Sequence, residues 1–336
     1  MTEKICGVVV TYNRKKLLID CLDSLKEQIM PLQGIYIIDN ASIDNTPKLL
    51  LTNGYIKELP PEEQDSPWEK EFEIINLLNN EPIKIHYVRM HKNIGGAGGF
   101  YEGIKRGYKK GYDWLWLMDD DGIPHQKALK AFFIKDIDPN FIYGSSAVFQ
   151  DLNGITKLCW PILNSERGLI TIHDDMKNIM KVHSIPFLGF FINKEAIKKA
   201  GFPDKNFFIS GDDVNYCQML KKAGLKIFLI KNSLLFHSEP PNLILKILNK
   251  KILYLKLPPW KRYYDTRNRI LTALAYYGIL DNILKMIPGI LLRWSISLLK
   301  EEDKFNQSKA YFYGIIHGFM GKKGILWEPG ALDTKK

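Results

Sequence analysis

Apolar residues in the first 240 positions form two alternating patterns, one typical of strands and one typical of helices. Brief β-branched or aromatic runs that stop at polar residues predict buried strands at residues 5–11, 34–39, 84–90, 113–118, 141–149, 183–192 and 226–230. Helical spacing or helix-start signals predict helices at residues 15–28, 44–51, 95–110, 193–200 and 212–224, with another beginning at Pro124. The strand–helix–strand order predicts an α/β protein with an open, mostly parallel sheet.

Two stretches interrupt this pattern. Residues 53–82 are rich in Glu, Pro and Asn, and they predict an inserted loop with a helix around residues 68–78. Residues 150–182 are polar and irregular, which predicts a surface excursion. We expect both stretches to be loop regions.

Polar side chains follow the first two predicted strands. Thr11 and Tyr12 come at the end of the first strand, and Asp39 and Asn40 come at the end of the second. Ligands of open α/β sheets bind beyond the carboxyl ends of the strands. These four residues are therefore candidate ligand contacts.

A glycine-rich run from Gly95 to Gly99 opens the helix after the third strand. It does not match the dinucleotide-binding pattern, because Gly96-x-Gly98 requires a third glycine at position 101, which is tyrosine. The glycines indicate a close backbone approach, either to a ligand or between the helix and the sheet.

Three consecutive carboxylates, Asp119, Asp120 and Asp121, follow the apolar run that contains Trp116. Adjacent like charges repel one another, and an unpaired buried carboxylate costs several kcal/mol, so a cation is expected among them. Alternate residues of an extended chain point the same way, which lets Asp119 and Asp121 face one Mg²⁺ or Mn²⁺ ion. A solvated acidic turn is the alternative.

Two later positions have both a structural and a chemical interpretation. Asp212 and Asp213 open a helix, where carboxylates are favourable as caps, but one of them is also a candidate general base. His237 ends an apolar run, where a histidine is more often structural than functional. The sequence pattern leaves both alternatives open.

Charge and cysteine content limit the partners and the compartment. The net charge of the 336-residue chain is +10, and residues 240–336 contain 17 Lys and Arg against 7 Asp and Glu, so this tail carries the whole excess. Such a tail suits an anionic partner, either nucleic acid or a membrane surface, or else it is merely a solvated basic face. Four scattered cysteines and an N-terminus without a signal-peptide pattern predict a reducing cytoplasm.

These motifs together resemble the family 2 glycosyltransferases, which have the nucleotide-sugar-binding GT-A fold. The resemblance covers about residues 5–240. Within the family, the sequence motifs look most like those of the bacterial rhamnosyl- and galactofuranosyltransferases. The matching segments, in chain order, are Val8 to Arg14, Ile37 to Asp44, Asn93 to Gly96, Asp119 to Asp121, Asp212-Asp213 and His237. The segment Tyr263 to Arg269, outside this range, is also similar to that branch.

The resemblance implies a role for each matching residue. Asp119 and Asp121 form the D-x-D pair that binds Mn²⁺ or Mg²⁺, and His237 completes the metal shell. Asp213 is the catalytic base, and Asp212 orients the acceptor or supports the start of the helix. This family often has glutamate at the first acid of the base motif, where this chain has Asp212. The donor-binding residues implied are Thr11, Tyr12, Asn13, Arg14, Asp39, Asn40, Asn93, Gly95, Gly96, Asp119 and Asp120.

The resemblance also implies the organisation and the reaction. Residues 1–239 form a GT-A domain with a mixed, mostly parallel sheet flanked by helices, and residues 240–336 form a basic, mainly helical extension. The reaction is a metal-dependent, inverting transfer of galactofuranose, rhamnose or another hexose from a UDP- or dTDP-sugar. The acceptor is a hydroxyl of a lipid-linked or growing surface glycan.

The tail suggests how such an acceptor is reached. Residues 263–277 and 279–299 predict helices, and charged residues with Pro288 in the second argue against a membrane crossing. A basic helix with leucine and tryptophan can instead lie on the inner face of the cytoplasmic membrane. The candidate acceptor contacts are Trp116, Asp212, Tyr264 and Arg267, and a homo-oligomer is possible.

Two rival functions are retained. A nucleotidyltransferase also uses paired carboxylates, but it requires a glycine in the basic loop after the first strand, and residues 12–16 contain none. A non-enzymatic nucleic-acid-binding protein would explain the basic tail but not the acidic triplet. We therefore expect an enzyme with no nucleic-acid partner.

Overall fold

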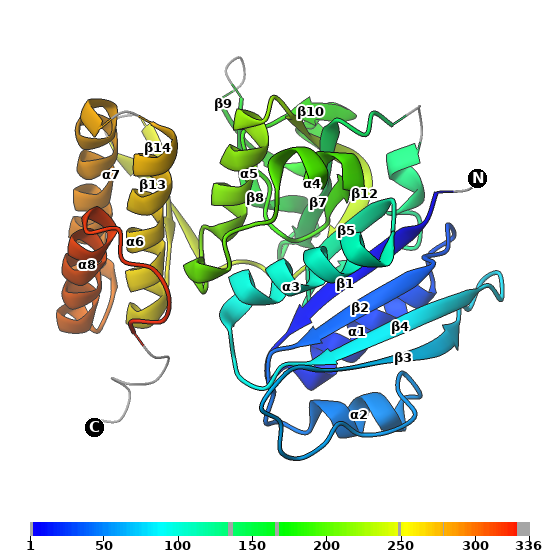
Figure 1. Cartoon of the computed structure of the whole chain (residues 1–336). Helices are drawn as coiled ribbons and strands as arrows, with labels where there is room; N and C mark the ends of the chain where they lie inside the picture. Colours follow the sequence, from blue (N-terminus) through cyan, green and yellow to red (C-terminus); the bar gives the residue numbers. More distant parts are fainter. Residues whose placement is uncertain (1–2, 134–136, 165–167, 248–249, 278, 328–336) are drawn as a thin grey trace.

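The computed structural model describes residues 3–133, 137–164, 168–247, 250–277 and 279–327. Within them, one large mixed sheet has the strand order β10-β12-β7-β11-β5-β1-β2-β4-β3 (Figure 1). Its strands are β1 (Ile5–Thr11), β2 (Gly34–Asp39), β3 (Trp68–Ile75), β4 (Pro82–Arg89), β5 (Trp114–Asp119), β7 (Phe141–Gln150), β10 (Ile179–Lys181), β11 (Phe190–Asn193) and β12 (Lys226–Phe236). The short β6 (Ile123–Pro124) pairs with β12, and β8 (Thr156–Asn164) with β9 (Gly168–Ile172) extends β7.

The centre of the sheet is parallel, as predicted. Strands β5, β1, β2 and β4 run in the same direction, while β11 is antiparallel to both of its neighbours. The flanking helices are α1 (Lys15–Lys26), α2 (Thr46–Thr52), α3 (Gly95–Lys110), α4 (Lys194–Ala200) and α5 (Asp212–Lys222). The predicted α/β class is therefore confirmed.

Alternation along β1 explains why helices cover both faces. Val8 and Val10 lie in one core cluster with Phe100 of α3, whereas Val9 lies in a second cluster with Leu18 of α1. Because successive strand residues point to opposite faces, an uninterrupted apolar strand must be covered on both sides. This geometry leaves the carboxyl ends of the parallel strands available for polar side chains.

Three glycines of α3 form a stripe against the sheet. A Cβ added at Gly99, Gly103 or Gly107 would lie 2.5 Å from Val10 Cγ1, 2.3 Å from Val8 Cγ1 or 2.6 Å from Leu115 Cδ2, respectively. Of the two interpretations of the glycine run, close packing between helix and sheet is therefore correct for Gly99, and Gly103 and Gly107 continue the same contact along α3.

Gly103→Ala should destabilise the fold by about 1–3 kcal/mol, because the added methyl group overpacks the contact with Val8. Gly96→Ala is the matched control, since no heavy atom lies within 4 Å of its added Cβ and alanine favours helices. The measurement is urea unfolding of both variants. Equal stability of the two variants would contradict a steric role for the Gly103 position.

Several sequence predictions were wrong. In the stretch predicted as a helix, Trp68–Ile75 form the antiparallel edge strand β3, because Phe72 and the strand pairing with β4 supply a buried contact. Residues 150–182 contain β8, β9 and β10 instead of only loop. After β6, the predicted helix from Pro124 is only the single 3₁₀ turn η1 (Lys130–Phe133) in the described residues.

The C-terminal region begins with a hairpin of β13 (Asn242–Ile247) and β14 (Lys250–Leu255) and continues with three helices. These are α6 (Pro259–Tyr276), α7 (Ile279–Lys300) and α8 (Lys304–Phe319), which stand together beside the sheet (Figure 1). The predicted helices in this region are confirmed, and α8 is an addition to them. The boundary at residue 239 remains a prediction.

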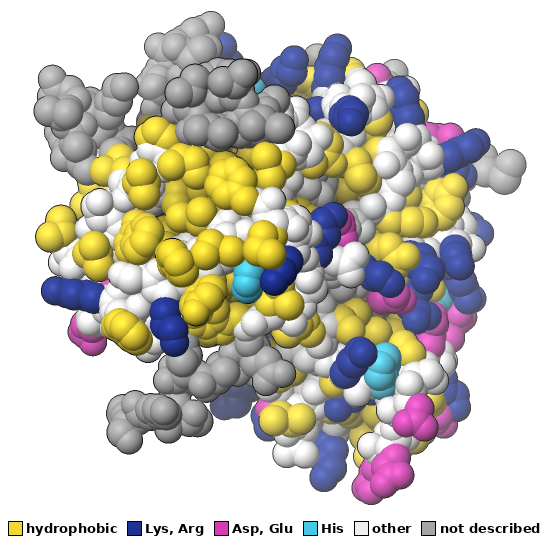
Figure 2. All heavy atoms as spheres, turned by 60° about the vertical axis from the view of Figure 1, so that its left-hand side comes forward, with side chains coloured by type: hydrophobic (Ala, Val, Ile, Leu, Met, Phe, Trp, Pro, Cys, Tyr) yellow, Lys and Arg dark blue, Asp and Glu magenta, His cyan; other side chains and the backbone are white. Residues whose placement is uncertain are grey.

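The outer side of the C-terminal helices exposes apolar side chains. Figure 2, with these helices turned toward the reader, shows hydrophobic side chains gathered there with Lys and Arg among them. Exposed members include Leu299 at the end of α7 and Phe305, Phe312 and Phe319 of α8. In the part of the chain that the structure describes, none of the helices combines the length and the apolar character needed for a membrane crossing.

Candidate active site

The acidic triplet lies beside the end of β1. Val10 pairs with Asp119 across β1 and β5, and the Thr11 hydroxyl donates a hydrogen bond of 2.6 Å to Asp120 Oδ2. Asp120 is 1% exposed, and burial raises its pKa to about 6, although Arg14 and the Thr11 hydrogen bond act against this rise. The middle carboxylate is therefore held by the protein's own groups.

Arg14 supplies a cation that the sequence predicted for the triplet. Its Nη1 lies 3.1 Å from Asp120 Oδ1 and also pairs with Asp121 Oδ2. The pKa of Asp119 is nevertheless raised well above its usual value, first by burial and then by the charges of Asp121 and Asp120. One guanidinium thus faces three carboxylates, and burial together with their mutual repulsion disfavours the ionised form of Asp119.

His237 reaches the same cluster from the far end of β12. The pairing of Phe236 with Ile123 brings the end of β12 next to the residues that follow the triplet. His237 Nε2 lies 3.6 Å from Asp121 Oδ2. Burial lowers the pKa of His237, but its contacts with Asp121 outweigh that effect and raise the pKa to about 10. The carboxylate and the imidazole therefore form a tight pair.

The predicted nucleotide-binding end of β2 is organised by buried hydrogen bonds. Asp39 accepts hydrogen bonds from the Tyr87 hydroxyl at 2.8 Å and from Arg89 Nη1 at 2.7 Å. Asn40 Nδ2 donates to the Gly95 carbonyl at 2.9 Å, whereas its buried Oδ1 has no hydrogen-bond partner among the described residues. A buried acceptor without a partner is unusual in a folded protein.

The remaining predicted donor contacts lie on the loops around this end of the sheet. Tyr12 is 40% exposed, and Asn13 Oδ1 accepts a hydrogen bond of 2.7 Å from the Ile43 amide. Asn93 Oδ1 accepts one of 2.8 Å from the amide of Gly95, which has a φ of +75°. Gly96 has open space around its Cβ position. Of the two glycines, Gly96 is therefore the one with open space beside its backbone.

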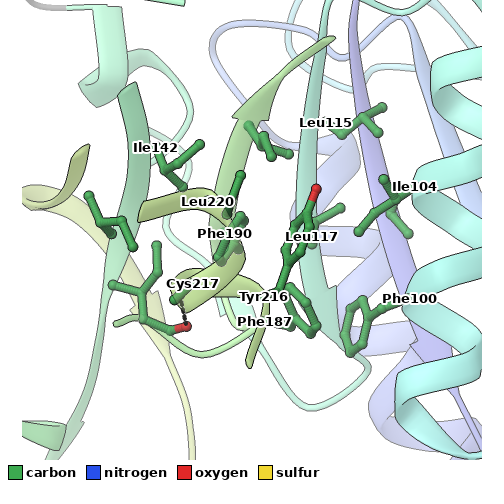
Figure 3. Packing of buried hydrophobic residues seen from close by; sticks show 14 of the residues in the cluster. Phe100, Ile104, Leu115, Leu117, Ile142, Phe187, Phe190, Tyr216, Cys217 and Leu220 are labelled. Carbon is green, nitrogen blue, oxygen red and sulfur yellow. Dashed lines mark hydrogen bonds between the residues drawn. The ribbon is translucent and has the colours of Figure 1, made fainter. Parts of the chain in front are cut away.

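The two acids of the second motif begin α5, whose body is fixed in the core. Tyr216 of α5 packs against Phe187 and Phe190 (Figure 3). Burial and the charge of Asp213 raise the pKa of Asp212 to about 7. The pKa of Asp213 rises to about 6 through burial, while a hydrogen bond from the Val214 amide and the charge of Arg269 oppose the rise. Asp212 also acts on Asp119, so the two acidic motifs share one electrostatic environment.

Three of the four predicted acceptor contacts are not accessible. Trp116, Tyr264 and Arg267 each have 0% exposed surface. Trp116 Nε1 bonds to Ser145, the Tyr264 hydroxyl donates to the Trp327 carbonyl, and Arg267 bonds to backbone carbonyls. Each is engaged within the fold because neighbouring elements cover it. Of that set, only Asp212 lies at the acidic site.

Lys261 is a site residue that the sequence did not reveal. Its pKa is lowered by burial and then by the charge of Arg14, while Asp119 and Asp121 act in the opposite direction. Lys261 belongs to the first turn of α6, so the charges of the acidic cluster act on a residue of the C-terminal region. No local pattern marks it, because about 140 residues separate it from the triplet and only the folded chain joins them.

Two side chains beside the acidic triplet are suitable ligands for a divalent ion. Among the described residues, no three His, Cys, Asp or Glu side chains are grouped closely enough to hold a metal by themselves. Asp121 and His237 nevertheless offer an oxygen and a nitrogen 3.6 Å apart, beside a negatively charged cluster. Ions of this kind are commonly bound by one or two side chains together with substrate phosphates. The additional role of Asp119 as a ligand remains a prediction.

Sequence comparisons agree with this geometry. The model of glycosyl transferase family 2 matches residues 6–53. The galactofuranosyltransferase GlfT1 of Mycolicibacterium smegmatis is 25% identical over 305 residues, which cover 87% of this chain and 89% of the relative. GlfT1 of Mycobacterium tuberculosis is 25% identical over 278 residues, which cover 80% of this chain and 82% of the relative.

Solved structures share the fold at low sequence identity. The mannosyltransferase PcManGT from Pyrobaculum calidifontis, in complex with GDP-Man and Mn²⁺, has a TM-score of 0.51 and 11% identity over 96% of this chain and 88% of its own. GalNAc-T7 with UDP, GalNAc and Mn²⁺ has a TM-score of 0.54 and 12% identity over 94% of this chain, which spans 56% of GalNAc-T7. The chain is therefore a glycosyltransferase with the GT-A fold, and it resembles the family 2 enzymes and, among them, galactofuranosyltransferases.

Proposed function

We propose that the protein transfers galactofuranose from a nucleotide diphosphate donor, with inversion, to a hydroxyl of a lipid-linked glycan. The observation that carries the proposal is the meeting of Asp121, His237 and Arg14 at the ends of the sheet, where the charge of Asp212 also contributes to the raised pKa of Asp119. The galactofuranosyltransferase relatives favour this sugar over rhamnose or another hexose.

In this mechanism Asp213 takes the proton of the acceptor hydroxyl while that oxygen attacks the anomeric carbon. A new glycosidic bond forms as the bond to the donor phosphate breaks, and the electron pair leaves with the nucleoside diphosphate. Attack opposite the leaving group inverts the configuration, and this step requires no second nucleophilic carboxylate.

A second group of residues would bind the nucleotide-sugar donor. Asn40 Oδ1, Asp39 and the open backbone at Gly96 would hold and orient the nucleoside. Asp121 and His237 would hold a divalent ion, which when bound neutralises charge on the departing diphosphate. Arg14 would remain close enough to balance the carboxylates of the triplet.

A panel of nucleotide sugars tests the proposal. UDP-galactofuranose, UDP-galactose, UDP-GlcNAc, GDP-mannose and dTDP-rhamnose would be incubated with the protein and Mn²⁺ or Mg²⁺, and release of the nucleotide would be measured. We expect the fastest release from UDP-galactofuranose, and the anomeric configuration of a transferred sugar, read by NMR, should be inverted. Preference for another donor would reject the sugar assignment, and retention would reject the mechanism.

Nucleic-acid binding would suit the basic tail but leaves the acidic triplet unexplained. The loop after β1 lacks the glycine that a nucleotidyltransferase requires, and the GlfT1 relatives are galactofuranosyltransferases. We therefore retain the glycosyltransferase reaction alone.

A membrane surface is the proposed location of the acceptor. Phe305, Phe312 and Phe319 are spaced by seven residues, so they lie on one face of α8, with exposed fractions of 73%, 51% and 42%. The net charge of residues 240–336 is +10, which suits anionic headgroups of the cytoplasmic leaflet. An apolar helix face with basic neighbours is typical of interfacial binding.

The variant Phe305→Glu/Phe312→Glu should lose binding to vesicles that contain phosphatidylglycerol, because it places charge on the exposed stripe of α8. Leu152→Glu is the control, since Leu152 is fully exposed on a loop between β7 and β8. The measurement is co-sedimentation at low and at high salt. Equal sedimentation of the double variant and the wild-type protein would remove the α8 face as the contact.

A further inference from the structure

The segment that leads into α5 has an unusual backbone. Phe208, Ser210 and Gly211 have φ values of +65°, +66° and +76°. Residues with side chains rarely adopt the left-handed region, and two of these three are not glycine. Such a conformation persists only where the surroundings impose it. The segment ends directly before Asp212 and Asp213.

One side chain of α6 contacts three carbonyl groups of this segment. Asn268 Nδ2 donates to the carbonyl oxygens of Phe207 at 3.0 Å, Ile209 at 2.9 Å and Ser210 at 2.7 Å. Arg267 Nε donates to Asn268 Oδ1 at 2.9 Å, and Arg267 Nη2 also reaches the Phe207 carbonyl at 3.0 Å. Both side chains have 0% exposed surface, so water does not compete for these hydrogen bonds.

The same segment also contacts the donor side of the site. The Ala97 amide of α3 donates to the Phe208 carbonyl at 3.0 Å. A Cβ added at Gly95 would lie 2.1 Å from that carbonyl oxygen, so the two backbones approach closely. Residues 207–211 therefore connect the glycine loop, the two acids of α5 and the C-terminal helices.

We propose that Asn268 is a positioning residue for the catalytic base. Its amide group donates to the carbonyls of Phe207, Ile209 and Ser210 and thereby sets the direction in which the Asp213 side chain projects from the first turn of α5. Arg267 orients the Asn268 amide by bonding to its oxygen. This inference deepens the proposed function and rests on the role of Asp213 in it.

Other contacts hold the rest of α5 in place, so a role of Asn268 in positioning Asp213 can be distinguished from a role in folding. Tyr216 and Leu220 are buried in the core, and Asn215 Nδ2 donates to Thr272 Oγ1 of α6 at 3.2 Å. Loss of the Asn268 amide should therefore loosen residues 207–213 while the helix remains packed. A displacement of about 1 Å at a catalytic group can cost about 10²-fold in rate.

The test compares Asn268→Ala and Asn268→Asp with Thr272→Val. The aspartate keeps the size of the side chain but removes its N–H donors, and Thr272→Val removes another buried hydrogen bond between α5 and α6. Hydrogen–deuterium exchange of the free proteins is measured for residues 207–213. Transfer from UDP-galactofuranose is measured as kcat and KM, and binding of UDP with Mn²⁺ is measured by calorimetry.

We expect both Asn268 variants to exchange faster in residues 207–213 and to lose about 10- to 100-fold in kcat, with KM and UDP affinity unchanged. Thr272→Val should resemble the wild-type protein in exchange of that segment and in kcat. Unchanged exchange in Asn268→Asp, or faster exchange with an unchanged kcat, would overturn the proposal. Hydrogen–deuterium exchange needs no substrate, so it tests the contacts of Asn268 even if the wild-type protein transfers no sugar. Absence of transfer by the wild-type protein would separately reject the proposed function.

Discussion

Replacing Asp213 with asparagine should lower the rate of sugar transfer by about 10²–10⁴-fold, the usual contribution of a general base. Asparagine keeps the size of the side chain and its place in the first turn of α5, but it cannot accept the acceptor's proton. Binding of the nucleotide should remain, since the proposed role of Asp213 is to act on the acceptor. The measurements are single-turnover transfer and calorimetric titration with UDP and Mn²⁺.

Asp212→Asn is the matched control, because it removes the neighbouring carboxylate from the same turn. A larger loss in Asp212→Asn than in Asp213→Asn would reverse the assignment of the base. Burial raises the pKa of Asp213 to about 6, and a base acts only when deprotonated. The wild-type rate should therefore be full above this pKa and should fall as the pH drops through about 6.

Asp121→Ala should abolish the dependence of nucleotide binding on Mn²⁺. The substitution removes the carboxylate next to His237 Nε2 and leaves Arg14 paired with Asp120 alone within the triplet. We expect UDP affinity in the presence of Mn²⁺ to fall by at least about 10–100-fold, the cost of losing even an outer partner of a metal ligand. The measurement is calorimetric titration of UDP with Mn²⁺ and with EDTA.

His237→Ala should reduce the same Mn²⁺ dependence, since it removes the other member of the pair. Asp44→Ala is a suitable control, because this carboxylate stabilises the turn before α2 through Thr46 and lies outside the triplet. An Asp121→Ala variant that keeps the wild-type response to Mn²⁺ would contradict the metal role.

Strands with strong local patterns were predictable from the sequence. The apolar run of β5 is buried on both faces, with Trp114 and Trp116 in one core cluster and Leu115 and Leu117 in the other. Its position in a parallel sheet follows from that continuous burial. The polar residues at its end then had to lie at the edge where ligands bind.

Contacts between distant segments were not predictable in the same way. Tyr264 and Arg267 look like exposed acceptor contacts in the sequence, yet the folded chain buries them under residues 324–327 and against Phe207. Lys261 approaches the triplet only because α6 docks beside it. Periodicity describes the face of an element but does not identify which distant segment covers that face.

The sequence prediction failed most clearly at the edge strand β3. This strand affects how copies of the protein can associate. One end of the sheet is β3, whose Glu69 pairs with Arg106 and whose Glu71 pairs with Lys110 on α3. Exposed edge strands invite a second chain to add to the sheet, and charged side chains discourage that growth. Two copies meeting along β3 would have to bring these charged rows together and disturb their pairs with α3, so self-association should use another surface.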